Sequence, residues 1–179
     1  MSHLLHTQIG KLIEEALKDI KGLKIVKDPA CCREGETALQ HIPLFCKNVK
    51  NRKTRYCCVD LLILQDDKIR VIVEIEESDI KPTQVCGKFL TSALSTYYIH
   101  DKDGDPKEMA ESVSFIQVLD SSKLKDRSVK LDQFYLLEES IQSILPLNNR
   151  RVNRYKLFTG TKNDQFDELI TFIKDELRY

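Results

Sequence analysis

Apolar residues recur at helical spacing in several parts of the chain. From Leu4 to Ile20 they return every three or four positions, with charged residues on the opposite side. This periodicity predicts an amphipathic helix over about residues 3–21 that ends near Gly22. Similar patterns predict further helices over about residues 82–99, 131–144 and 166–177.

Continuous apolar runs, partly β-branched, predict strands. The clearest are residues 56–64 and 69–76, and the segment Gln65-Asp66-Asp67-Lys68 between them has the composition of a tight hairpin turn. Residues 47–55 and 100–106 are polar and predict exposed connections. Shorter extended segments are expected over residues 24–27, 37–45, 114–119 and 155–158.

The order of these elements favours one α/β domain with a mixed sheet, of the α+β kind. A chain of 179 residues without internal repeats suits a single domain over residues 1–179. We expect its core over about residues 3–119 and a C-terminal extension of helices and a strand over about residues 120–179.

Composition and charge limit the function classes. Hydrophobic residues make up 41% and charged residues 31%, which excludes a disordered or collagen-like chain. Without an apolar run of roughly 18 residues or a visible signal peptide, we expect a soluble, cytoplasmic protein that does not enter a membrane. The 28 basic and 28 acidic residues cancel, which argues against coating nucleic acid by bulk charge but leaves room for local charge segregation.

The cysteines are expected to be free thiols, because no secretory signal is visible. No C-x-x-C spacing occurs, so the typical zinc arrangement is missing, and we interpret most of them as small buried apolar residues. A composite site made of Cys31, Cys32, Cys46 and His41 is the alternative. The six positions are Cys31, Cys32, Cys46, Cys57, Cys58 and Cys86.

Acidic residues interrupt the two clearest strands. Asp60 lies inside an apolar run, where an unpaired carboxylate would cost roughly 2–7 kcal/mol or more. Strand alternation places Arg70, Ile72, Glu74 and Glu76 on one face of the second strand. Asp60 and Glu74, together with waters and phosphate oxygens, would give the oxygen-rich shell that Mg²⁺ prefers.

The hairpin register decides whether Asp60 and Glu74 can meet. A regular two-residue loop at Asp66-Asp67 places Asp60 opposite Val73 and turns it away from Glu74. A three-residue loop, or a bulge in the strand, places Asp60 opposite Glu74. A shared metal site therefore predicts the longer or bulged hairpin.

At these residues the chain resembles the PD-(D/E)xK nuclease superfamily, which includes many type II restriction endonucleases. The resemblance covers about residues 3–119, with motif-level detail in residues 56–90. It aligns Asp60 with the first acid, Glu74 with the second, and Glu76 with the usual lysine. It implies a restriction-endonuclease-like α-β-β-β-α-β core with extra C-terminal helices, and Mg²⁺- or Mn²⁺-dependent cleavage of DNA.

Glutamate at position 76 departs from the family pattern, although some restriction enzymes carry Glu-x-Glu there. The resemblance then implies that Glu76 ligates a metal or accepts a proton from the attacking water. Lys88, four residues after Gln84 on the following helix, is the candidate for a relocated lysine, and both residues are candidates to contact nucleic acid. Lys81 is an alternative that precedes the helix.

A further acid from the first helix occurs in some members of the superfamily. Glu14 and Glu15 are the candidates in that helix, but helical phase favours a solvated position for both. Glu34 and Glu36 lie in a segment that the pattern does not place.

Basic residues form acid-free clusters on either side of the acidic strands. Two such clusters could clamp the phosphate backbone of DNA, although ordinary solvated loops have the same composition. A third cluster, residues 123–130, is diluted by Asp126. The candidate phosphate contacts are Lys50, Arg52, Lys53, Arg55, Arg150, Arg151 and Arg154.

The pattern thus predicts a metal-dependent endonuclease acting on DNA, and cutting both strands favours a homodimer. The alternative is an inactive module of the same fold that binds nucleic acid or a protein partner. A weaker reading is an unrelated domain whose acids form surface ion pairs. No phosphate-binding loop, dinucleotide motif or Ser-His-Asp arrangement indicates an organic cofactor or another chemistry.

Overall fold

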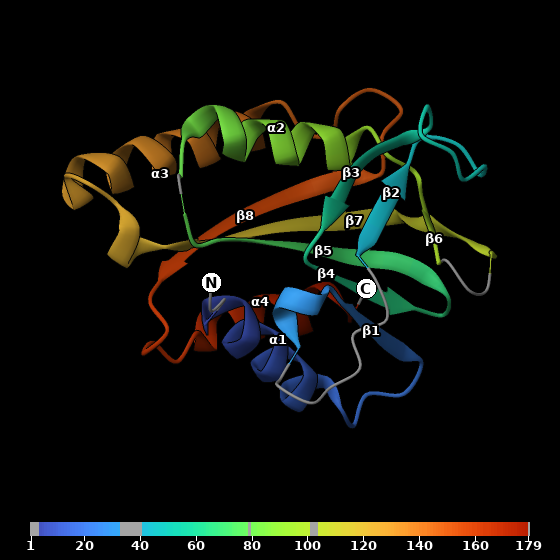
Figure 1. Cartoon of the computed structure of the whole chain (residues 1–179), viewed down its shortest axis with the longest axis horizontal. Helices are drawn as coiled ribbons and strands as arrows, with labels where there is room; N and C mark the ends of the chain where they lie inside the picture. The colour runs from blue at the N-terminus through green and yellow to red at the C-terminus, as the bar shows by residue number, and fades with distance from the viewer. Residues whose placement is uncertain (1–3, 33–40, 79, 101–103, 179) are drawn as a thin grey trace.

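A computed structural model describes residues 4–32, 41–78, 80–100 and 104–178. Helices cover both sides of a mixed sheet (Figure 1). The helices are α1 (Leu4–Leu17), α2 (Pro82–Ala93), α3 (Arg127–Ser143) and α4 (Asp167–Glu176), with short 3₁₀ turns η1 (Pro29–Cys31) and η2 (Ser121–Lys123). The strands are β1 (Leu23–Lys27), β2 (Ile42–Phe45), β3 (Arg55–Val59), β4 (Leu61–Gln65), β5 (Lys68–Glu76), β6 (Tyr97–Ile99), β7 (Pro106–Asp120) and β8 (Val152–Gly160).

The sheet has two parts, called wings below, that share the long strand β7. One wing contains β1, β4, β5 and β8, and the other contains β2, β3 and β6. The strand order is β1-β4-β5-β7-β6-β2-β3, and β8 also pairs with β7. The pairs β5–β7 and β7–β8 are parallel, whereas the remaining pairs are antiparallel. This mixed orientation confirms the expected α+β class.

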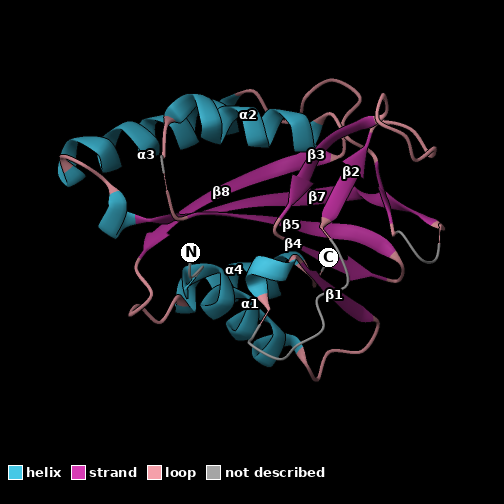
Figure 2. Ribbon diagram, in the orientation of Figure 1, coloured by secondary structure: helices cyan, strands magenta, loops and turns pink. Residues whose placement is uncertain are grey.

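Helices α2 and α3 lie on one face of the sheet, and α1 and α4 lie on the other (Figure 2). Each face has its own apolar core, because successive strand residues point to opposite sides. In β5, Ile72 packs on the α2 side, whereas Val71 and Val73 pack on the side of α1 and α4. Burial on both faces explains why β4 and β5 are almost continuously apolar.

The β4–β5 hairpin has a two-residue loop and a bulge. Asp66 and Asp67 have φ angles of 49° and 66°, the left-handed conformations typical of a type I′ turn. The register shifts between Ile63 and Leu64, so that Leu61 pairs with Val73 rather than with Ile72. Extending this register places Asp60 opposite Glu74, which confirms the bulged arrangement that a shared site requires.

The bulge also overturns one expectation from strand alternation. Arg70 was expected on the face of Glu74, but its guanidinium donates to the carbonyl oxygens of Ser112 and Glu176 at 3.2 and 2.8 Å. It therefore lies toward α4, because the extra residue in the bulged strand reverses the alternation at that point.

The largest error in the expected elements concerns the end of α2. The helix was expected to run to about residue 99, but it ends at Ala93, and residues 97–99 form β6. Tyr97 and Tyr98 pair with Phe45 and Leu44 of β2, a tertiary contact that overrides the helical spacing. The strand expected over residues 56–64 is divided at Asp60 into β3 and β4, which pair with different neighbours. The remaining expected elements are present, although α1 ends at Leu17 rather than near Gly22 and β7 is much longer than residues 114–119. Residues 37–40 and 101–103 of the expected segments lie outside the described part.

All six cysteines are free thiols, as expected. Only Cys31 is fully buried, so the expectation that most of them are buried is wrong, and Cys58 is exposed. His41 pairs with Asp28 at 2.7 Å instead of completing a cysteine site. No helix in the described ranges is long and apolar enough to cross a membrane.

Candidate active site

Asp60 lies at the joint where the chain leaves β3 in one wing and enters β4 in the other. Its main-chain carbonyl accepts a hydrogen bond from Asp28 N at 2.9 Å, and its carboxylate accepts one from Ile75 N at 2.7 Å. The side chain is thus fixed against β5, beside the position of Glu74. The sequence-predicted pair is brought together by the bulged register.

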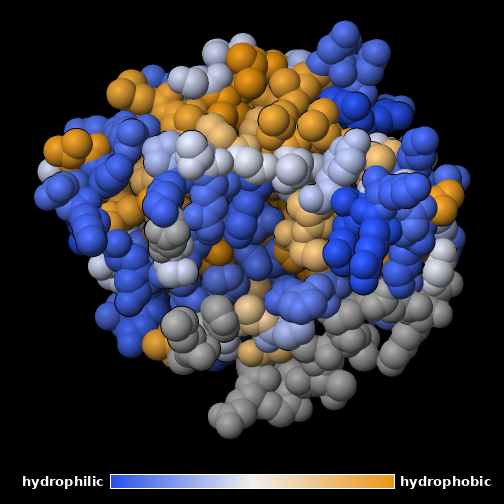
Figure 3. Space-filling model, turned by 45° about the horizontal axis from the view of Figure 1, so that its top comes forward, coloured by the Kyte–Doolittle hydropathy of each residue, from blue (hydrophilic) through white to orange (hydrophobic). Residues whose placement is uncertain are grey.

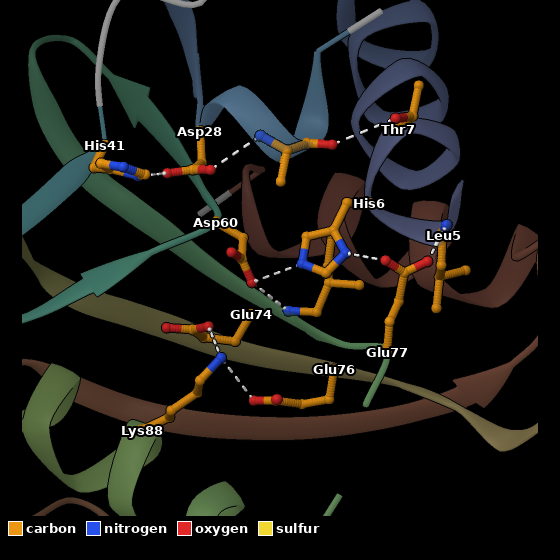
Figure 4. Close-up of polar contacts among 12 residues, drawn as sticks. Leu5, His6, Thr7, Asp28, His41, Asp60, Glu74, Glu76, Glu77 and Lys88 are labelled. Atoms are coloured by element: carbon orange, nitrogen blue, oxygen red, sulfur yellow. Dashed lines mark hydrogen bonds and ion pairs between the residues drawn. The ribbon is translucent and has the colours of Figure 1, made fainter. Parts of the chain in front are cut away.

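Glu74 and Glu76 are buried beneath α2, with exposed fractions of 1% and 3%. The reading that these acids form surface ion pairs is therefore wrong. Lys88 extends from α2 and places its ammonium nitrogen 2.9 Å from Glu74 Oε2 and 2.9 Å from Glu76 Oε1 (Figure 4). Gln84, one turn earlier, donates to Glu76 Oε2 at 3.4 Å. The helical spacing of Gln84 and Lys88 thus directs both side chains to the acids.

The carboxyl groups differ in how readily they ionise. Burial and the negative charge of Asp60 raise the pKa of Glu74 well above its usual value, against the opposing charge of Lys88. Burial likewise raises the pKa of Glu76. Burial opposes ionisation of Asp60, but His6 and Lys88 outweigh it and hold the pKa of Asp60 below its usual value. The site therefore combines one ionised carboxylate with two that hold protons more tightly.

His6 is the residue of this site that the sequence did not reveal. It comes from α1, its Nδ1 lies 2.8 Å from Glu77 Oε2, and its Nε2 lies 3.6 Å from Asp60 Oδ2 (Figure 4). Glu77 also accepts a hydrogen bond from Leu5 N, which ties the start of α1 to the end of β5. The available signal was a histidine on the buried, apolar stripe of an amphipathic helix.

No further acid from α1 reaches the site. Glu14 pairs with Lys27 at 3.0 Å, and Glu15 lies 3.9 Å from Lys11, so neither faces the site. Glu34 and Glu36 lie outside the described residues. The first helix contributes a histidine where the superfamily resemblance suggested a carboxylate.

A cavity of about 550 Å³ is lined by His6, Asp60, Glu74 and Lys88, whereas Glu76 is not among its lining residues. Asp60, Glu74 and Lys88 form one side of it, and Asp28 and His41 form part of another. Its volume lies within the range of ligand pockets, roughly 300–1,000 Å³.

The donor set fits one Mg²⁺ ion held by two carboxylates. Glu74 Oε1 is buried and receives no hydrogen bond from a donor among the described residues. Glu74 also lies within hydrogen-bonding reach of Asp60, which contributes to its raised pKa, so a cation or a shared proton is needed between the two carboxyl groups. Mg²⁺ is commonly bound by one or two carboxylates and keeps several waters, so Asp60 and Glu74 would suffice. Across the described ranges, no three His, Cys, Asp or Glu side chains gather to hold a metal, so Glu76 does not join them in a single ligand set.

The candidate phosphate contacts divide into two groups. Lys50, Arg52 and Arg55 line a second cavity of about 410 Å³, and Lys53 is exposed on the same loop. Arg150 approaches that side of the molecule, since it donates to Leu94 O at 3.0 Å, whereas Arg151 is exposed beside it.

Arg154 lies apart from both groups. It forms an ion pair with Glu176 of α4, on the opposite face of the sheet from Glu74. The expected contact between Arg154 and DNA at this site is therefore not supported by its position.

Comparisons with known proteins add no relative to this geometry. No family model, curated protein or solved structure matches this chain.

Proposed function

We propose that this protein is a Mg²⁺-dependent endonuclease of restriction-endonuclease-like core that hydrolyses phosphodiester bonds in DNA. One observation carries the proposal: Asp60, Glu74 and Lys88 line one cavity, and the Lys88 ammonium, which contacts both Glu74 and Glu76, stands in for the lysine that the motif carries at position 76. The buried, unpartnered oxygen of Glu74 supports a cation beside Asp60.

Each side chain has a role that follows from its position. Asp60 and Glu74 would hold the ion, which polarises the scissile phosphate and acidifies a bound water. Glu76, whose pKa is raised by burial, is suited to accept the proton of the attacking water. Lys88 would place its positive charge against the phosphate. The water oxygen bonds to phosphorus as the bridging P–O bond breaks, and the leaving oxygen takes up a proton.

Plasmid cleavage tests this function. Wild type should nick or cut plasmid DNA with Mg²⁺ or Mn²⁺ and be inactive in EDTA, and Asp60→Asn and Glu74→Gln should each lose at least about a hundredfold in rate. Glu15→Gln, which removes an exposed acid from α1, is the matched control and should cut normally. Equal cleavage by Asp60→Asn and wild type would overturn the proposal.

We also propose that two copies act together, because cutting both strands requires two sites. Light scattering of the purified protein should give twice the chain mass, and a monomer that only nicks plasmid would contradict this.

An inactive binding module is the second candidate, and one observation favours it. The ammonium of Lys88 already contacts both glutamates, so much of the acidic charge is neutralised without a metal. This function predicts folded wild-type protein that binds DNA but shows neither cleavage nor stabilisation by Mg²⁺.

A further inference from the structure

The cavity between β2 and the loop before β3 adjoins the candidate active site. His41 and Cys58 line both this cavity and the one that contains Asp60 and Glu74. Cys58 precedes Asp60 by two residues, which span only about 7 Å in an extended strand. A nucleotide in the first cavity would therefore lie within a few nucleotide steps, at about 3.4 Å each along a stacked strand, of a phosphate at Asp60.

Its walls combine positive charge with an apolar floor. Lys50, Arg52 and Arg55 form the cationic side, and no acidic residue belongs to the lining in the described part of the chain. Pro43 and Phe45 of β2 form the floor. In Figure 3, strongly hydrophilic side chains gather at the right, where the loop before β3 lies in Figure 1. Such a combination suits a phosphate and a base of the same nucleotide.

Lys50 and Arg52 lie on the loop before β3, which is held in shape by its own hydrogen bonds, and Arg55 is the first residue of β3. Asn51 Oδ1 accepts from the main-chain nitrogens of Lys53 and Thr54 at 2.8 and 3.1 Å. Thr54 is buried, and its main-chain oxygen accepts from Cys46 N at 2.9 Å. Arg52 therefore projects from a preorganised loop and Arg55 from a strand residue paired with Phe45, which lowers the entropic cost of binding.

We propose that this cavity binds one unpaired nucleotide of the DNA strand whose neighbouring phosphate enters the active site. The proposal rests on the proposed nuclease function and narrows its substrate class to single-stranded DNA or DNA with an unstacked nucleotide. In a regular duplex the bases are stacked inside, so only the backbone could meet the arginines. A base that has left the stack can reach the floor at Pro43 while its phosphate stays at the rim.

Binding of a fluorescent oligothymidylate tests the assignment, beside a mixed-sequence duplex of the same length. The full chain carrying Asp60→Asn in Mg²⁺ prevents cleavage during the measurement. Adding Arg52→Gln and Arg55→Gln should weaken binding of the single strand about tenfold and that of the duplex much less. The slope of log K against log salt should fall by about 1.4, since each single-strand contact contributes about 0.7.

The control pair is Lys18→Gln with Lys21→Gln, which removes the same charge from exposed residues around the far end of α1. It should leave binding unchanged. Equal losses for single strand and duplex, or an equal loss in the control pair, would overturn the assignment. Unchanged melting midpoints establish that the variants are folded.

Alkylation of Cys58 provides a local readout. This thiol is exposed and lines both cavities, so bound oligothymidylate should slow its reaction with iodoacetamide at least fivefold, leaving Cys86 on α2 unaffected. Unprotected Cys58 under saturating oligothymidylate contradicts the assignment.

The outcomes separate this inference from the nuclease proposal. If binding of the single strand depends on both arginines but wild type cuts no DNA, the cavity binds a nucleotide and the nuclease proposal is wrong. Cleavage by wild type, with single-strand binding insensitive to both arginines, would give the reverse result.

Discussion

Lys88 Nζ on α2 lies 2.9 Å from Glu74 Oε2 on β5, fourteen positions earlier in the chain. A positive charge is therefore brought to the buried glutamates of β5 by a helix that packs over the strand. Since Glu74 is almost completely buried, this ammonium offsets part of the cost of ionising it, although burial and the charge of Asp60 still raise the pKa of Glu74 well above its usual value.

Lys88→Met should lower the free energy of unfolding by about 2–3 kcal/mol. Breaking a buried ion pair costs about 3–5 kcal/mol, and partial exposure of Lys88 together with protonation of Glu74 reduces this. Urea unfolding at constant pH measures the loss. Adding Glu74→Gln to Lys88→Met should restore part of it, and a double variant that is weaker still would contradict this account of the pair.

Mg²⁺ should stabilise the wild-type protein through Asp60 and Glu74. At a concentration of about 100 times Kd the gain is about 2.7 kcal/mol, which corresponds to several degrees in Tm for a chain of this size. Thermal unfolding with MgCl₂, against matched ionic strength in NaCl, measures the gain. Asp60→Asn should abolish it, and an undiminished shift in that variant would place the ion elsewhere.

His6 should make the stability of the metal-free protein depend on pH. Burial lowers its pKa, but Asp60 and Glu77 more than offset that effect, so its folded pKa lies above the usual 6.5. The stabilisation is therefore complete below about pH 6.5 and is lost as pH rises through the higher folded pKa. Subtracting the unfolding free energies of His6→Asn from those of wild type, in EDTA between pH 5 and 9, should show this decline. A difference that grows with pH would have the wrong sign.

Two glycines in helices should respond to alanine in opposite ways. A Cβ on Gly10 of α1 would lie 2.4 Å from Cys31 O in η1, so Gly10→Ala should destabilise by about 1–3 kcal/mol. Gly87 in α2 has open space around it, so Gly87→Ala should stabilise by about 0.5–1 kcal/mol. Chemical denaturation of both variants gives the comparison, and a stabilising Gly10→Ala would show that η1 can move away.

Local patterns located the acids but could not fix their environment. Asp60, Glu74 and Glu76 were visible because charged residues interrupt apolar runs. Whether Asp60 faced Glu74 depended on a bulge that leaves no mark on the turn sequence. Helical phase alone was enough to propose that Lys88 faces the acids, because its orientation depends only on α2 and the neighbouring strand β5.

Long-range pairing explains what remained hidden. His6 contacts Glu77, which is 71 positions away, and no local periodicity reports such a contact. Tyr97 suits a helix face and a strand equally well, and pairing with Phe45 selects the strand. Arg154 belonged to a promising basic cluster, but its ion pair with Glu176 depends on how α4 packs.

Strand β7 has a consequence for how the protein loses its site. Its 15 residues pair with β6 in one wing and with β5 and β8 in the other. Because both wings pair with β7, neither wing can unfold without disrupting a strand of the other. The two wings should therefore melt as one cooperative unit. Since Asp60 is the covalent joint between the wings and Glu74 belongs to one of them, a partly unfolded chain should retain no partial site.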